Sequence, residues 1–171
     1  SLDARRMQAL GAEAIGARAG EVLVLSTGVI GKFLDMDKLA HGVTALRGDG
    51  ARRAPGDTAR AITTTDTVPK IAAATTRLGG HDVHIAGFAK GAGMIHPNMA
   101  TMLAVVTTDA AIDPARLDRA LRAAVARSFN RISVDGDMST NDTVLVLASG
   151  ASGASLGDAE EPEFTAALVD V

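Results

Sequence analysis

Apolar residues recur at the spacing of an amphipathic helix, about every 3.6 residues, in several separate parts of the chain. Gly20 is the expected end of the first such helix, and Asp35 is the expected N-cap of the second. Asp113 is the expected cap of the third, with Pro114 at its first position, where a missing backbone N–H is tolerated. The predicted helices therefore cover residues 2–19, 35–46 and 114–129, with a further helical pattern from residue 164.

Shorter runs of apolar and β-branched residues predict strands between these helices. The pair Gly79-Gly80 separates two of the runs and predicts a tight hairpin turn. Polar segments 47–57 and 150–163 predict surface loops. Because hairpins and helical crossovers both occur, the pattern predicts an α+β or layered α/β fold, with mixed sheets packed between helices. The predicted strands are residues 21–25, 61–68, 71–78, 82–88, 101–108, 132–134 and 143–147.

Composition narrows the function classes. The chain has 171 residues, 47% of them hydrophobic, which is enough for a core in one ordinary domain or in a piece of a larger one. Aromatic residues make up only 2% and the net charge is -3, which argues against nucleic-acid modules, since these use aromatic stacking and basic surfaces. The absence of cysteine excludes disulfides, thiol catalysis and cysteine-bound zinc. The apolar runs are too short to cross a bilayer.

The two ends of the sequence indicate a segment of a longer protein. The chain begins at Ser1 without an initiator methionine, and it stops at Val171 within a helical pattern. Residues 1–8 lack the apolar core of a signal peptide. We therefore expect residues 1–171 to be a single central segment of a larger protein, one compatible with a reducing cytoplasm.

The most informative stretch is residues 86–103, in which a glycine-rich loop, residues 90–100, runs directly into a strand beginning at Thr101. A threonine hydroxyl is a weak nucleophile and needs an adjacent base. Cleavage of the Ala100–Thr101 bond would make the threonine an N-terminus, whose α-amine has an ordinary pKa of about 7.7–8.0 and can act as that base. The Thr101 hydroxyl can make this cut by attacking the Ala100 carbonyl, and a small preceding residue suits that attack.

Four ordered blocks of the chain together resemble the ornithine acetyltransferases, the bifunctional glutamate N-acetyltransferases of the arginine pathway. The third block contains Lys-Gly-Ala-Gly-Met followed by Met-Ala-Thr-Met-Leu, which is similar to the self-processing site of that family. The resemblance implies a layered, self-cleaving architecture like that of N-terminal-nucleophile enzymes, with helices outside paired sheets. The four blocks are residues 26–31, 63–70, 86–103 and 133–143.

The resemblance also implies roles for individual residues. Thr101 is the implied nucleophile, and Ala100–Thr101 is the implied cleaved bond, so that residues 1–100 end an α chain and residues 101–171 begin a β chain. The residues implied at the substrate are Thr27 and Gly28, which supply the oxyanion hole, and Thr67 and Lys90, which with Thr101 contact the amino acid.

The implied reaction moves an acetyl group from N2-acetylornithine to glutamate through a threonine acyl-enzyme. The family resemblance implies neither a metal nor an organic cofactor. It also allows acetyl-CoA as an alternative acetyl donor. The implied partners are these small-molecule substrates and the complementary α and β fragments of the same precursor, in a heterotetramer. A cytoplasmic location is implied, without nucleic acid or membrane as a partner.

Other functions fit the same residues. An amidase or aminopeptidase can use an N-terminal threonine with water as the acceptor, and an antibiotic-pathway acyltransferase can use it with a different amine. In a non-catalytic fragment, Thr101 is only a β-branched strand residue. Lys90 lies beside two glycines, Gly91 and Gly93, but the Gly-Lys-Ser/Thr order of a phosphate loop is absent.

Two metal sites can be considered and are disfavoured. His81 and His84 follow the predicted hairpin turn, where we expect them to face solvent without a third ligand. The acidic segment 135–142 suggests a calcium loop, but its glycine is misplaced and no bidentate glutamate follows at the required position. A polar turn that orders the wall of the active site is the preferred interpretation.

Overall fold

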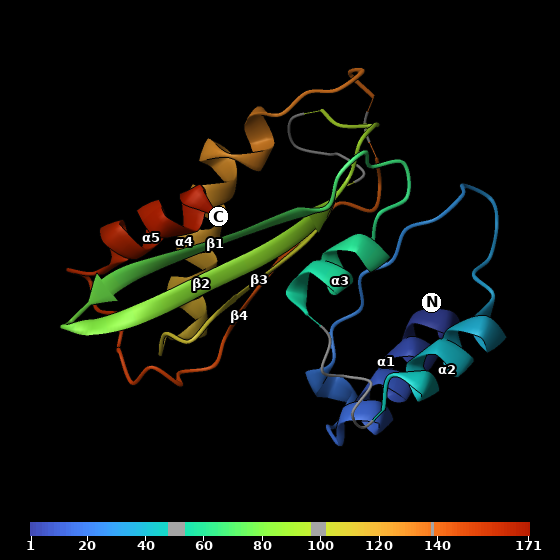
Figure 1. The fold of residues 1–171 in the computed structure, drawn as a ribbon, viewed down its shortest axis with the longest axis horizontal. Helices are drawn as coiled ribbons and strands as arrows, with labels where there is room; N and C mark the ends of the chain where they lie inside the picture. Colours follow the sequence, from blue (N-terminus) through green and yellow to red (C-terminus); the bar gives the residue numbers. More distant parts are fainter. Residues whose placement is uncertain (48–53, 97–101, 138) are drawn as a thin grey trace. The chain divides into compact units, whose positions relative to one another are not determined.

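The structure is a computed structural model that describes residues 1–47, 54–96, 102–137 and 139–171. The chain forms two compact units, Ser1–Ala54 and Pro55–Val171. The first unit is helical, and the second combines a sheet with helices (Figure 1). None of the helices in these described ranges is long and apolar enough to cross a bilayer.

The first unit contains two α-helices that the sequence predicts. Asp35 caps the second helix as expected, because its side chain accepts a hydrogen bond from the backbone N–H of Lys38 at 3.1 Å. The first helix ends at Gly16 rather than at Gly20, because Gly16 adopts the left-handed conformation of a C-cap, with φ of 70°. The elements of this unit are α1 (Leu2–Ile15), the 3-10 helix η1 (Ala19–Glu21) and α2 (Met36–Ala45).

The predicted strand at residues 21–25 is wrong. Glu21 belongs to η1, Val22 is extended, and residues 22–28 have no regular secondary structure and pair with no described strand. The backbone oxygen of Val22 instead accepts a hydrogen bond from the Gln8 side chain of α1 at 2.8 Å. The apolar run is therefore not a buried strand, and Leu23 is 57% exposed within it. A run of four apolar residues does not distinguish a strand from an irregular segment that packs on a helix.

The second unit is built on a four-stranded sheet in the order β1-β2-β3-β4. The first two pairings are antiparallel and the pairing of β3 with β4 is parallel, which confirms a mixed α+β fold. The predicted hairpin is confirmed, since Gly79 and Gly80 have φ values of 57° and 87° and join β1 to β2. The strands are β1 (Lys70–Leu78), β2 (His81–Lys90), β3 (Leu103–Thr108) and β4 (Thr143–Ala148).

Helices in the second unit follow the predicted pattern in part. Asp113 caps the long helix by accepting a hydrogen bond from the Arg116 backbone N–H at 3.0 Å, with Pro114 at the first position, as predicted. In place of the predicted strand at residues 61–68, Ala61 is helical and residues 62–68 form a turn and bends, and Val134 makes only an isolated bridge to Ile95. The helices are α3 (Pro55–Ala61), which starts inside a predicted loop, α4 (Pro114–Arg127), the 3-10 helix η3 (Phe129–Arg131) and α5 (Glu161–Asp170).

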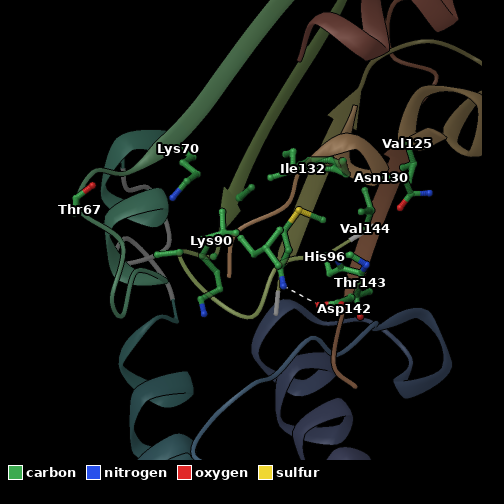
Figure 2. Close-up of a pocket in the computed structure, with 17 residues that line it drawn as sticks. Thr67, Lys70, Lys90, His96, Val125, Asn130, Ile132, Asp142, Thr143 and Val144 are labelled. Carbon is green, nitrogen blue, oxygen red and sulfur yellow. Dashed lines mark hydrogen bonds between the residues drawn. The ribbon is translucent and has the colours of Figure 1, made fainter. Parts of the chain in front are cut away.

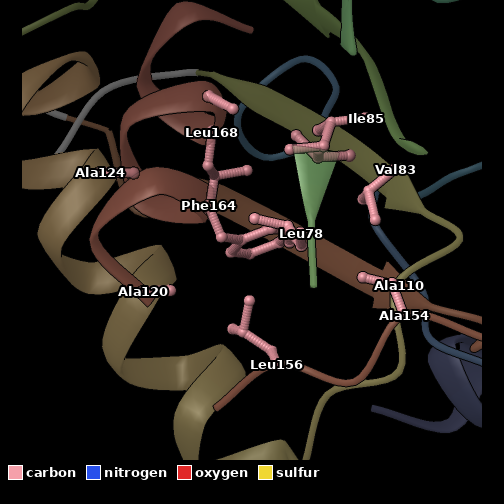
Figure 3. Close-up of a cluster of buried hydrophobic side chains, with 12 residues drawn as sticks. Leu78, Val83, Ile85, Ala110, Ala120, Ala124, Ala154, Leu156, Phe164 and Leu168 are labelled. Carbon is pink, nitrogen blue, oxygen red and sulfur yellow. The ribbon is translucent and has the colours of Figure 1, made fainter. Parts of the chain in front are cut away.

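The core of this unit lies between the sheet and the helices α4 and α5 (Figure 3). Phe164 of α5 is fully buried and packs in one cluster with Leu78, Val83 and Ile85 of the hairpin. The buried residues of α4 are Ala120 and Ala124, whose small side chains let α5 approach closely. This core packs against one face of the sheet, and the loops that leave the strand ends lie beyond it.

Candidate active site

One end of the sheet gathers all three sequence blocks that fall within the second unit. β1 begins there, β2 ends there, and β3 and β4 both begin there, as the strand directions require. Lys90 pairs with Leu103 and Leu103 pairs with Thr143, so the ends of β2, β3 and β4 form one row across the sheet. Segments that are far apart in the sequence therefore meet at this edge.

A cavity of about 440 Å³ lies at this end of the sheet, and the described residues that line it all belong to the second unit. Figure 2 shows Lys70 and Lys90 on one side of it and Asp142, Thr143 and Val144 on the other. Its volume suits a small molecule such as an amino acid derivative. The polar lining residues are Thr67, Lys70, Lys90, His96, Asn130, Asp142 and Thr143, and the apolar ones include Ile95, Met102, Val125, Phe129, Ile132 and Val144.

Lys90 is the buried cation of this cavity. It is the last residue of β2 and only 5% of its surface is exposed. No carboxylate of the described residues lies within ion-pair distance of its ammonium group. A buried ammonium needs a negative partner, so a carboxylate ligand in the cavity is chemically favourable.

Asp66 connects the threonine-rich loop to the start of β1 and the end of β2. Its carboxylate, which is 0% exposed, accepts hydrogen bonds from the Lys70 ammonium and from the Gly91 backbone N–H at 2.8 Å. The Thr64 backbone N–H adds a longer contact of 3.5 Å. Burial alone would raise the pKa of Asp66, but the bonds from Lys70, Gly91 and Thr64 outweigh it and lower the pKa to about 2. Asp66 is therefore a permanent anion near neutral pH.

Asp142 fixes the backbone that enters β3. Its Oδ1 atom accepts a hydrogen bond from the Met102 backbone N–H at 2.8 Å, while the Thr143 N–H donates to the Met102 oxygen at 3.0 Å. Burial raises the pKa of Asp142, and the bond from Met102 only partly opposes this rise. Its second oxygen, Oδ2, is buried without a hydrogen-bond partner among the described residues. Both backbone groups of Met102 are thus held by the segment that begins β4.

The glycine-rich loop is held by the turn around Asp135. The Met94 backbone N–H donates to Asp135 Oδ2 at 2.8 Å, and this bond is the main reason that the pKa of Asp135 is lowered. Ile95 and Val134 exchange two backbone hydrogen bonds of 3.2 and 2.6 Å. A side chain at Gly93 would come within 3.3 Å of Asp135 Oδ2, so glycine permits this close approach. This turn is a structural clamp, in agreement with its interpretation as a polar turn.

The residues predicted from sequence fall into three groups. Thr67 and Lys90 both line the cavity. Ala100 and Thr101 lie outside the described residues, so the cleavage junction stays a prediction. Thr27 and Gly28 lie in the first unit, where Thr27 is half-buried and Gly28 is exposed. They directly precede a turn in which the Lys32 N–H donates a hydrogen bond to the Val29 oxygen at 3.1 Å. Their role as an oxyanion hole also stays a prediction.

The histidines predicted to face solvent lie away from the cavity. His84 is exposed, and its Nδ1 atom lies 2.8 Å from Asp109 Oδ2. His81 is also exposed, at the start of β2. Among the described residues, no group of three or more potential ligands has the arrangement of a metal site.

Sequence reasoning missed three residues that line the cavity or hold the backbone beside it. Asp66 and Lys70 lie in the threonine-rich block, and Asp142 lies in the last block, but no role was predicted for any of them. A signal was present in the sequence. Asp66 is the single charged residue between Ala61 and Pro69, and a lone carboxylate in such a loop is a strong acceptor for backbone N–H groups.

Comparison with known proteins identifies the family. A model of the ArgJ family matches residues 1–171. The arginine biosynthesis bifunctional protein ArgJ of Geobacter sulfurreducens is 52% identical over 172 residues, which cover 99% of this chain and 44% of that protein. The protein of the same name from Symbiobacterium thermophilum is 56% identical over 151 residues, or 88% of this chain and 38% of that protein. A mitochondrial relative from Aspergillus terreus is 47% identical and covers 90% of this chain and 35% of its own length.

A solved structure agrees with these sequence matches. The crystal structure of the arginine biosynthesis bifunctional protein argJ from Bacillus halodurans superimposes with a TM-score of 0.52 at 45% identity, over 57% of this chain and 51% of that chain. This chain spans less than half the length of the curated relatives described above. The family model covers every residue, and the resemblance predicted from the four sequence blocks is confirmed. The chain belongs to the ArgJ family.

Proposed function

We propose that the protein containing this chain transfers an acetyl group from N2-acetylornithine to glutamate in arginine biosynthesis. The observation that carries the proposal is the convergence of three family blocks on one cavity at the end of the sheet. That cavity offers a buried ammonium, hydroxyl groups and an apolar wall, which match the carboxylate and methylene chain of both amino acids. The names of the curated relatives support the pathway.

The proposed nucleophile is Thr101, freed by cleavage of the Ala100–Thr101 bond. Its hydroxyl attacks the acetyl carbonyl of acetylornithine while its own α-amine takes the proton. The amide C–N bond then breaks, ornithine leaves with a proton from that ammonium, and an acetyl ester remains on the threonine. Glutamate attacks the ester through its amine, so acetylglutamate forms and the hydroxyl is restored. The intermediate divides one difficult transfer into two easier steps.

Lys90 and Thr67 are proposed to bind the α-carboxylate that donor and acceptor share. Lys90 supplies a compact charge that no carboxylate of the described residues neutralises, and Thr67 supplies a hydroxyl at the cavity wall. Thr27 and Gly28 are proposed to stabilise the oxyanion of each tetrahedral intermediate, since a hydroxyl and an adjacent backbone N–H can point at one atom.

Other parts of the proposal concern the assembly. The α and β fragments are proposed to stay together as a heterotetramer in the cytoplasm. The threonine ester route uses no metal and no organic cofactor, and acetyl-CoA is an alternative donor that would acetylate the same hydroxyl. Each of these features belongs to the whole protein, of which this chain is a part.

Product analysis of the full-length protein tests the proposed reaction. The protein is incubated with acetylornithine in the presence and absence of glutamate, and acetylglutamate and free acetate are measured. We expect acetylglutamate to form one-for-one with ornithine when glutamate is present, with little acetate. The Thr101→Ala protein is the matched control and should form neither product. Equal acetate release with and without glutamate would instead identify a hydrolase, and the transferase proposal would be wrong.

A further inference from the structure

Two lysines line the same side of the cavity, but their surroundings differ. Lys70 begins β1 and pairs in the ladder with Ala89, so it lies next to the end of β2 where Lys90 stands. Lys70 is 44% exposed and bonds to the Asp66 carboxylate. Lys90 is buried and has no carboxylate partner among the described residues. A ligand that carries one carboxylate therefore meets two cations, only one of which is neutralised.

Asp66 causes this difference through two separate contacts. Its Oδ1 atom accepts from the Lys70 ammonium and also from the Gly91 backbone N–H at 2.8 Å. Gly91 directly follows Lys90 and has φ of 145°, a conformation that favours glycine. A single buried carboxylate thus neutralises one lysine and fixes the backbone that carries the other.

The open end of the hairpin explains why such an anchor is needed. The turn that joins β1 to β2 is at Gly79-Gly80, at the far end of both strands. At the cavity end the two strands are held by ladder hydrogen bonds and by Asp66, which reaches Lys70 on one strand and Gly91 after the other. Without this bridge, the chain after Lys90 would lose an acceptor for a part-buried N–H group.

We infer that Asp66 is a positioning residue that assigns the two lysines different roles. It neutralises Lys70 and fixes the backbone next to Lys90, so that Lys90 alone binds the substrate carboxylate. This inference rests on the proposed function only for the identity of the substrate, because the assignment of roles holds for any ligand with a carboxylate. Asp66 acts through the lysines and does not itself contact the ligand.

Binding to the processed full-length protein tests this assignment, with glutamate and succinate as probes in calorimetry. Lys90→Ala should weaken both probes by about 10- to 100-fold, the effect of losing one charge-assisted hydrogen bond. Asp66→Asn keeps an acceptor for the Gly91 N–H but releases Lys70 from its anion. The double variant Asp66→Asn/Lys90→Ala should therefore bind at least about 5-fold more tightly than Lys90→Ala alone. Adding Lys70→Ala to that pair should abolish the recovery.

Asp109→Asn is the matched control. Asp109 also accepts a hydrogen bond from a backbone N–H and pairs with a basic side chain, both of His84, but it does not line this cavity. Asp109→Asn/Lys90→Ala should bind the probes no better than Lys90→Ala. If Asp66 were purely structural, Asp66→Asn would lower the melting temperature, as we expect of Asp109→Asn, without restoring any binding. A folded double variant of Asp66 and Lys90 without recovered affinity therefore overturns the assignment.

A second measurement needs no substitution at Asp66. In wild-type protein with 15N-labelled lysine, succinate should shift the side-chain Nζ resonance of Lys90 and leave that of Lys70 in place. A shift of Lys70, or no binding of either probe, overturns the inference. If succinate follows the expected pattern but no acetylglutamate is made, the proposed reaction fails and the assignment of the lysines stands. If acetylglutamate is made but succinate does not give this lysine pattern, the assignment of the lysines fails and the proposed reaction stands.

Discussion

The Oδ1 atom of Asp142 accepts a hydrogen bond from the backbone N–H of Met102 at 2.8 Å. Together with the bond from the Thr143 N–H to the Met102 oxygen, it ties the start of β3 to the start of β4. Met102 directly follows Thr101 in the sequence, so this contact holds the residue next to the proposed nucleophile. The proposed cleavage chemistry depends on such fixation, because small displacements of reacting groups slow reactions severely.

We predict opposite outcomes for two substitutions of Asp142. Asp142→Ala leaves the Met102 N–H without its acceptor, which should destabilise the fold by about 1–3 kcal/mol and slow self-cleavage. Asp142→Asn keeps an acceptor. Because burial raises the pKa of Asp142, its charged form destabilises the fold as pH rises above the ordinary carboxyl range, and the neutral amide avoids this effect. The Asn variant should therefore melt at or above the wild-type temperature at pH 7.

Thermal unfolding and the intact mass of freshly made full-length protein check both variants of Asp142. An Asn variant less stable than the Ala variant would show that the contact with Met102 is not what holds this segment.

Asp66 should give the fold a defined acid sensitivity. Its pKa is lowered from 3.8 to about 2, so its charged form stabilises the folded state above pH 4. That contribution, at most about 2 kcal/mol, should disappear as the pH falls from about 4 to about 2. Urea unfolding of wild type and Asp66→Asn across this range measures it. The stability gap between the two proteins should close at low pH, and a gap independent of pH would contradict the charge network.

Loss of the Thr27 hydroxyl should affect turnover more than substrate binding. If Thr27 donates to the developing oxyanion, Thr27→Ala should lower kcat by roughly 10²–10³-fold with little change in KM. Thr44→Ala is a matched control. Thr44 is an exposed threonine of the same unit, and its hydroxyl donates a hydrogen bond to the Ala40 backbone oxygen at 2.9 Å. Steady-state kinetics decide the matter, and a folded Thr27 variant with normal kcat removes this residue from the oxyanion hole.

Local signals predicted much of the fold. Asp35 and Asp113 are N-caps because a short carboxylate reaches the free N–H groups of the first turn, and this requires no tertiary information. Gly79-Gly80 forms the hairpin because only glycine adopts two successive left-handed conformations without strain. The helix α1 ends at Gly16 and not at Gly20. Both glycines meet the local requirement of a helix C-cap, so the sequence alone does not choose between them.

The contacts of the site were not predictable in the same way. Thr67 and Lys90, which the family blocks single out, both line one cavity, but the bond of Asp66 to Gly91 joins residues 25 positions apart and depends on the pairing of β1 with β2. The bond of Asp142 to Met102 likewise joins residues 40 positions apart. Such contacts follow from the sheet register, which is set by the packing of the whole core and not by local propensity.

Self-cleavage should depend on the Thr101 hydroxyl. Full-length protein made without added protease should give two fragments by intact mass, the second beginning Thr-Met-Leu. Thr101→Ala should remain a single chain, and Thr101→Ser, which keeps a hydroxyl, should still be cut. Thr107→Ala is the control, because Thr107 is a threonine of β3 whose hydroxyl only contacts the Ala86 oxygen at 3.3 Å, and it should be cut normally. An active wild-type protein that stays uncut would rule out the N-terminal threonine.

The most direct test of the account is to look for the acetyl ester on Thr101. Processed full-length protein is incubated with acetylornithine and without glutamate, quenched in acid, digested and examined by mass spectrometry. We expect one acetyl group on the peptide that begins at Thr101, and its loss as acetylglutamate when glutamate is added before quenching. If no acetylated peptide forms, and acetyl transfer proceeds only when both substrates are bound together, the threonine acyl-enzyme is contradicted.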